Sequence, residues 1–143
     1  MAGILVAEDD AHMLRILSIW LQRNGHEVFE ARDGLMAKEG LRSRSFDFVV
    51  SDVNMPGLDG IGLVRWLRGE HKSNVPMILL SSRCDQKAIA EEVAPLDVEV
   101  HPKPFSPSRL VAEIERKLAR SGSPNAEQED RGGGSEPAVV QRP

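Results

Sequence analysis

The segment from Val49 to Gly60 constrains the fold more than any other part of the chain, and it reads Val-Val-Ser-Asp-Val-Asn-Met-Pro-Gly-Leu-Asp-Gly. It opens with apolar strand formers and ends in the turn dipeptides Pro56-Gly57 and Asp59-Gly60, after which apolar residues resume at helical spacing. Asp52 is therefore predicted to lie at the carboxyl end of a buried strand. In open parallel sheets that edge is where ligands bind, so Asp52 is either a reactive carboxylate or a strand-terminating turn residue.

The remaining apolar pattern predicts an α/β fold in which strands alternate with amphipathic helices. The predicted strands cover residues 4–7, 27–31, 48–52, 75–80 and 98–101, and the predicted helices cover 12–24, 34–44, 61–67, 85–93 and 107–118. Such alternation implies parallel pairing with right-handed crossovers. The carboxyl ends of all the strands, and the polar residues that follow them, then lie along one edge of the sheet.

An acidic run, Glu8-Asp9-Asp10, follows the first predicted strand. Asp10 is interpreted as the N-cap of the next helix, because aspartate is a preferred capping residue. Glu8 and Asp9 are predicted to lie near Asp52, where clustered carboxylates would repel one another. A hard divalent cation that takes oxygen ligands would relieve this repulsion.

The segment from Asp52 to Gly60, with Met55, Pro56 and Asp59 between them, resembles the D-x-x-M-P-x-x-D-G signature of response regulator receiver domains, the CheY-like domains of two-component signal transduction. The resemblance implies a doubly wound, flavodoxin-like five-stranded parallel sheet with strand order 2-1-3-4-5. It also implies that Asp52 is the residue phosphorylated by a histidine kinase. The acidic pair that this family carries after its first strand falls on Glu8 and Asp9.

Two further positions match the family at strand ends. Ser81 follows a P-x-I-x-L-like strand. In isolation its hydroxyl reads as part of a turn or a helix cap. The resemblance implies instead that it donates a hydrogen bond to a phosphoryl oxygen. Lys103 begins the triplet Lys-Pro-Phe, and in isolation it reads as a solvated loop lysine. The resemblance implies that Lys103 pairs with the acceptor carboxylate or its phosphoryl group. The Lys-Pro bond at this position is commonly cis in the family. The implied Mg²⁺ ligands are Asp9, Asp52 and the backbone carbonyl of Asn54, with Glu8 acting through water.

The chain departs from the family pattern at its expected switch. Receivers usually carry Tyr or Phe three residues before the motif lysine, and that position is Val100 in a chain that has no tyrosine. Ser81 and Val100 are thus the expected switch positions. Where the family usually has a run of small residues, this chain has Ala94-Pro95-Leu96-Asp97, which predicts a stiffer loop. A further departure is His101, at a position where an aliphatic residue is common.

Composition narrows the remaining possibilities. A net charge of −4 argues against nucleic-acid binding through a basic surface, and Cys84 is alone, so we expect a reducing, cytoplasmic location. No apolar run approaches a membrane span, and His12 and His26 lack partners at metal-ligand spacing, so both are interpreted as surface or loop residues. We expect a receiver domain over residues 1–120 and a disordered tail over 121–143.

Three functions remain open. The first is a single-domain receiver, not an enzyme acting on a separate substrate, that is phosphorylated on Asp52 with Mg²⁺ by a sensor histidine kinase or a histidine phosphotransfer protein. It would act on an unknown protein target as a monomer or weak dimer, without binding nucleic acid or membrane. The second is a non-phosphorylated adaptor with the same fold. The third is an Asp-nucleophile phosphohydrolase of the haloacid dehalogenase type, which needs an acid where this chain has Asn54.

Overall fold

The computed structural model describes residues 2–82 and 84–120, which form a single parallel sheet covered by helices on both faces. The strands are β1 (Gly3–Ala7), β2 (Glu27–Ala31), β3 (Phe48–Asp52), β4 (Met77–Ser82) and β5 (Glu99–Lys103). The helices are α1 (Ala11–Arg23), α2 (Gly34–Ser43), α3 (Gly60–Arg68), α4 (Gln86–Val93), the short 3₁₀ helix η1 (Ala94–Leu96) and α5 (Pro107–Arg120). The alternation predicted from the sequence is confirmed.

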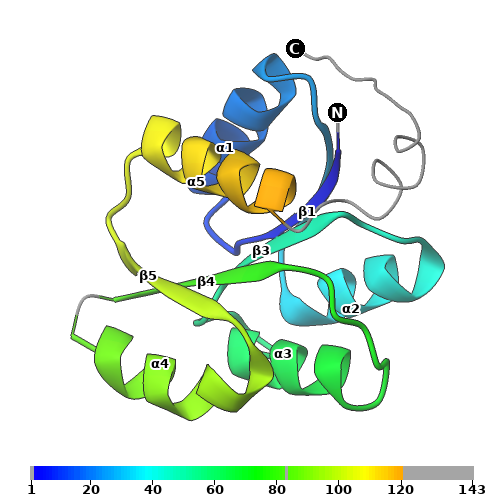
Figure 1. Ribbon diagram of the computed structural model, residues 1–143, viewed down its shortest axis with the longest axis vertical. Coiled ribbons are helices and arrows are strands. Elements are labelled where there is room, and N and C mark those ends of the chain that lie inside the picture. The colour runs from blue at the N-terminus through cyan, green and yellow to red at the C-terminus, as the bar shows by residue number, and fades with distance from the viewer. Residues whose placement is uncertain (1, 83, 121–143) are drawn as a thin grey trace.

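The sheet has the order β2-β1-β3-β4-β5, so the predicted doubly wound topology is also confirmed. Helices α1 and α5 cover one face, and α2, α3 and α4 cover the other (Figure 1). The two faces bury separate apolar clusters, which meet the sheet through alternate residues of each strand, as Leu79 and Leu80 show. The central strand β3 is buried along its whole length, which holds its last residue, Asp52, firmly in place.

Helix capping agrees with the sequence at most positions. The Asp10 side chain accepts hydrogen bonds from the backbone amides of His12 and Met13 and so caps α1, as predicted. Asp85 precedes α4 but makes no side-chain capping bond, and its carboxylate instead accepts a hydrogen bond from the Ser82 hydroxyl. The strand β4 also continues through Ser81 and Ser82, two residues beyond its predicted end.

His26 lies in the loop between α1 and β2, as predicted, but it is more deeply packed than an ordinary loop residue. Its side chain is only 7% exposed, and its Nε2 lies 2.9 Å from a Glu115 carboxylate oxygen of α5. Its Nδ1 accepts a hydrogen bond from the Ala2 amide. His26 therefore joins the start of β1, the connection before β2 and the last helix, a long-range packing role that no local spacing could indicate.

Gly60 allows the turn after Asp52 to close tightly. A Cβ atom at this position would lie 2.4 Å from the Asp52 carbonyl oxygen and 2.9 Å from the Val53 Cα, both of which are backbone atoms that cannot rotate away. The Gly60 amide donates a hydrogen bond to the Val53 carbonyl. The final Gly of the sequence signature thus brings the start of α3 against the end of β3. Across residues 2–82 and 84–120, every helix is too short or too polar to cross a bilayer.

Candidate functional site

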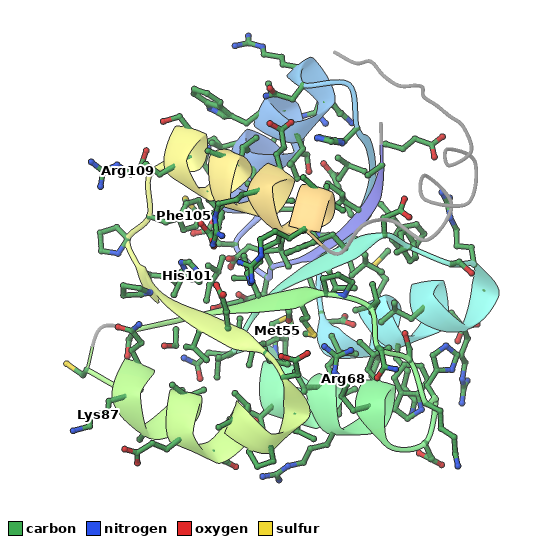
Figure 2. The ribbon with its side chains drawn as sticks, in the orientation of Figure 1. Met55, Arg68, Lys87, His101, Phe105 and Arg109 are labelled. Carbon is green, nitrogen blue, oxygen red and sulfur yellow. The ribbon has the colours of Figure 1, made fainter. Side chains whose placement is uncertain are left out.

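A cavity of about 660 Å³ opens at the carboxyl edge of the sheet, at the ends of β1, β3, β4 and β5. Its polar lining includes Glu8, Asp9, Asp52, Asn54, Ser82 and Lys103. Phe105, labelled on the connection between β5 and α5 in Figure 2, also lines it. The structure therefore brings together most of the residues that the sequence singled out, because parallel strands end at the same edge of a sheet.

Three carboxylates meet in this cavity. One oxygen from each of Glu8, Asp9 and Asp52 lies within 4.8 Å of the others. Glu8 and Asp52 are each only 3% exposed, whereas Asp9 is exposed. Burial, followed by the charge of Asp52, raises the pKa of Glu8 to about 7, and burial also raises the pKa of Asp52. The cluster is thus held in an environment where its full negative charge is unfavourable.

Lys103 is the cation that faces these acids. Its Nζ lies 3.3 Å from an oxygen of Asp52 and 3.5 Å from an oxygen of Glu8. Burial alone would lower the pKa of Lys103, but the two carboxylates raise it above its ordinary value, so the side chain stays charged. The Lys103-Pro104 bond is cis, as the resemblance implied. Lys103 therefore supplies one positive charge to a group of three acids.

The donor set fits a magnesium ion. Mg²⁺ prefers oxygen ligands and is usually held by one or two carboxylates, a carbonyl and water. Here the carboxylates of Asp9 and Asp52 converge, Asn54 lines the same cavity, and Glu8 stands behind them. Burial and then the charge of Asp52 raise the pKa of Glu8 despite the opposing charge of Lys103. A further cation beside the three carboxylates would therefore stabilise their ionised forms.

The two serines at the end of β4 are placed differently. Ser81 is 1% exposed and is not among the residues that line the cavity. Its hydroxyl donates a hydrogen bond to the Ser82 carbonyl. Ser82, which sequence reasoning treated only as part of the strand end, lines the cavity. Strand alternation could have drawn attention to it, since neighbouring residues of a strand face opposite sides of the sheet.

The region around the expected switch residue Val100 is tied together by hydrogen bonds. The Gln86 side-chain amide donates to the Val100 carbonyl over 3.1 Å, which links the start of α4 to the edge strand β5. The Arg68 guanidinium, on α3 (Figure 2), donates to the carbonyls of Leu96 and Asp97. The segment from Ala94 to Leu96, where the sequence predicts a stiffer loop, forms the short helix η1.

His101 lies outside the cavity, in a charged network between β5 and α5. Its Nε2 is 3.0 Å from a Glu99 oxygen, and the other Glu99 oxygen lies 2.5 Å from the Lys117 ammonium. Oxygens or nitrogens of Glu99, His101 and Glu113 also lie within 4.8 Å of one another. Because Lys117 contacts Glu99 and Arg116 contacts Glu113, these acids already have cationic partners.

Comparison with known proteins agrees with this geometry. The family model of the response regulator receiver domain matches residues 4–115. The transcriptional regulatory protein CseB of Streptomyces avermitilis is 36% identical over 119 residues, which cover 83% of this chain and 50% of CseB. This chain spans about half the length of the curated relatives that it matches.

Solved structures show the same architecture. The receiver domain of the Francisella response regulator 1452 superposes with a TM-score of 0.78 at 30% identity, covering 85% of this chain and 99% of that one. The chemotaxis response regulator CheY4 of Vibrio cholerae gives a TM-score of 0.74 at 29% identity, covering 81% of this chain and 98% of CheY4. The fold is therefore CheY-like.

Proposed function

Because this chain belongs to the family of response regulator receiver domains in two-component systems, we propose that it accepts a phosphoryl group on Asp52 from a sensor histidine kinase or a histidine phosphotransfer protein. The observation that carries the proposal is the convergence of Asp52 with two acids and Lys103 in one cavity. A buried carboxylate at the end of the central strand, with an opening toward solvent, is placed to act as a nucleophile.

In the proposed reaction an oxygen of Asp52 forms a bond to phosphorus while the bond between phosphorus and the donor breaks. The product is an acyl phosphate, and the donor leaves with the electron pair of the broken bond. Lys103 already lies within 3.3 Å of Asp52, so its ammonium can follow the negative charge onto the phosphoryl oxygens. Ser81 would donate its hydroxyl to another phosphoryl oxygen after turning away from the Ser82 carbonyl.

Asp9, Asp52 and the Asn54 backbone carbonyl would hold Mg²⁺, with Glu8 acting through water. When bound, the ion neutralises negative charge on the acids and on the incoming phosphoryl group. The protein itself holds the carboxylate oxygens close together. Asp10, at the start of α1, donates a hydrogen bond from its amide to a Glu8 oxygen over 3.1 Å. The buried strand β3 fixes Asp52.

We place the phosphorylatable unit in residues 1–120 and the protein in the cytoplasm. Its output would be a protein-protein contact made as a monomer or weak dimer, without nucleic acid and without catalysis on a separate substrate. Support for the boundary comes from α5, which ends at Arg120 and packs Leu110, Val111 and Ile114 into the core. The predicted tail, 121–143, lies outside the described residues. Truncation after Arg120 should leave phosphorylation intact.

Incubation with acetyl phosphate and Mg²⁺, followed by intact-mass measurement, tests the proposal. A receiver gains one phosphoryl group per chain and loses it slowly, with little turnover of other phosphate esters. Repeated turnover of p-nitrophenyl phosphate would indicate a phosphohydrolase. An unchanged mass, with no binding of beryllofluoride, would indicate an adaptor that keeps only the fold. Either of these last two results would contradict the proposed function.

A further inference from the structure

Ser82 lines the cavity but has no role in the phosphoryl transfer proposed above. Ser82 pairs with Lys103 across the β4–β5 ladder, and Leu80 pairs with Asp52 across the β3–β4 ladder. Paired residues of parallel strands share a face, as do residues two apart on one strand. Asp52, Ser82 and Lys103 therefore project from the same face of the sheet. Ser81 projects from the opposite face.

Within residues 2–82 and 84–120, the Ser82 hydroxyl bonds to Asp85. It donates a hydrogen bond to a carboxylate oxygen of Asp85 over 3.0 Å, and the donor is fixed because an ionised carboxylate can only accept. The Asp85 amide in turn donates to the Ser82 carbonyl over 3.1 Å, which closes a tight turn after β4. Ser82 thus lines the cavity while its hydroxyl is held by Asp85, an exposed acid that precedes α4.

We propose that the Ser82 hydroxyl is a further phosphoryl-oxygen donor, held by Asp85 in the unphosphorylated protein and released from it when Asp52 carries a phosphoryl group. The proposal rests on the function proposed above, because it concerns the same cavity. Only the Ser82 hydroxyl rotates about its χ1 bond. No covalent bond of Ser82 or Asp85 changes.

The exchange is favoured by the surroundings of the two acceptors. Asp85 is exposed, so water can solvate its carboxylate when the hydroxyl leaves. A phosphoryl group carries up to two negative charges and is therefore a stronger hydrogen-bond acceptor than the singly charged carboxylate. Ser81 must break its bond to the Ser82 carbonyl and move from behind the sheet to reach the same oxygens. Ser82, in contrast, already lines the cavity.

The exchange also has a route to the rest of the fold. Asp85 directly precedes Gln86, whose side chain donates to the Val100 carbonyl on β5. Release from Ser82 leaves the Asp85 carboxylate free to rotate toward the amides of the first turn of α4, which have no side-chain cap in this structure. In a chain with valine at the switch position, the Ser82–Asp85 pair is then the contact that senses the phosphoryl group at the start of α4.

Beryllofluoride binding in the presence of Mg²⁺, measured by titration on the full chain, tests the proposal. Ser82→Ala should weaken binding roughly three- to tenfold, because one hydrogen bond to a charged acceptor is lost. Ser82→Thr, which keeps a hydroxyl, should bind within about twofold of wild type. Ser43→Ala, which removes an exposed hydroxyl on α2, is the matched control and should have no effect. Unchanged Mg²⁺ affinity in each variant shows that the cavity is intact.

A double-mutant cycle separates hydrogen-bond exchange from simple charge repulsion. Asp85→Ala should tighten beryllofluoride binding, since Ser82 no longer has to leave an acceptor. This gain should shrink by at least about half in the Ser82→Ala background, whereas relief of charge repulsion would persist there in full. Undiminished binding by Ser82→Ala, or an equal gain in both backgrounds, would overturn the role of Ser82 and leave phosphorylation of Asp52 standing. Absence of binding in the wild type would overturn both.

Discussion

The ammonium nitrogen of Lys103 lies 3.3 Å from a carboxylate oxygen of Asp52, across the ends of β5 and β3. The same nitrogen lies 3.5 Å from Glu8, so one lysine is shared by two buried acids. The pKa of both acids is raised, because the nearby charge of Lys103 does not outweigh the cost of burying each carboxylate. Lys103 can therefore move toward a more highly charged partner, and a phosphoryl group on Asp52 would be such a partner.

Lys103→Ala should still bind beryllofluoride with Mg²⁺, but without the conformational response. The metal ligands remain, so much of the charge is still neutralised, whereas the link between the phosphoryl group and β5 is lost. Amide hydrogen exchange with and without beryllofluoride checks this. Lys87→Ala, an exposed lysine on α4 (Figure 2), should behave like the wild type. A full exchange response in Lys103→Ala would contradict the assigned role.

Among single substitutions of acidic residues other than Asp52, Asp9→Ala should weaken Mg²⁺ binding most. Asp9 is the exposed member of the carboxylate cluster and can contact an ion directly, whereas Glu8 is buried and paired with Lys103. Titration with Mg²⁺ measures the difference. Asp33→Ala, which removes the capping acid of α2, is the control and should leave the affinity unchanged. Equal affinities in wild type and Asp9→Ala would refute the ligand assignment.

Glu8 should make the metal-free protein less stable as the pH rises from about 4.5 to about 7. Its pKa is near 7 in the folded state and near 4.5 when unfolded, so within this window the folded state binds more protons than the unfolded state. The free energy of unfolding therefore falls with rising pH, by on the order of 2 kcal/mol. Glu8→Gln should reduce this slope, leaving the part that comes from the raised pKa of Asp52, and should be the more stable protein at pH 8.

Chemical denaturation across this pH range, without divalent ions, gives the two profiles. Glu39→Gln, an exposed glutamate on α2, should follow the wild-type profile. If the free energy of unfolding of Glu8→Gln depended on pH in the same way as that of the wild type, protonation of Glu8 would not contribute to stability.

Phosphorylation should change the loop from Ser81 to Asp85 more than the face formed by β5 and α5. Val100 provides no ring to fill the space behind Ser81, and α4 is held to α3 by the 2.7 Å ion pair between Arg65 and Glu92. A ligand shifts an equilibrium only by its differential affinity for the two states. Hydrogen exchange or NMR shifts on beryllofluoride addition test this. Large changes across 98–101 and 110–118, with new dimer formation, would mean that the usual switch survives.

Much of the fold follows from local patterns in the sequence. Apolar runs of strand formers and helical spacing predicted the five strands and the five α-helices but not the 3₁₀ helix η1. Capping residues such as Asp10 marked helix starts, because these signals depend on near neighbours. Strand ends were less certain. The strand β4 extends over Ser81 and Ser82 because β5 continues beside them to Lys103, and that pairing is a long-range contact.

The candidate site was found through acids and a lysine that follow strands, since parallel topology sends all strand ends to one edge. The sequence did not show which serine faces the cavity, because this depends on the register of β4 against its neighbours. It also did not show the contact of His26 with Glu115, which joins residues far apart in the chain. Both features depend on tertiary packing, to which local spacing is insensitive.

Phosphorylation of Asp52→Asn tests the central claim most directly. The variant and the wild type are incubated with the same phosphoryl donor and Mg²⁺, and incorporation is followed by intact mass. Asp47→Asn is the matched control, since Asp47 precedes β3 at the opposite edge of the sheet and its side chain accepts a bond from Gly3. We expect one phosphoryl group per chain in the wild type and in Asp47→Asn, and none in Asp52→Asn. Incorporation into Asp52→Asn at the wild-type rate would contradict the account.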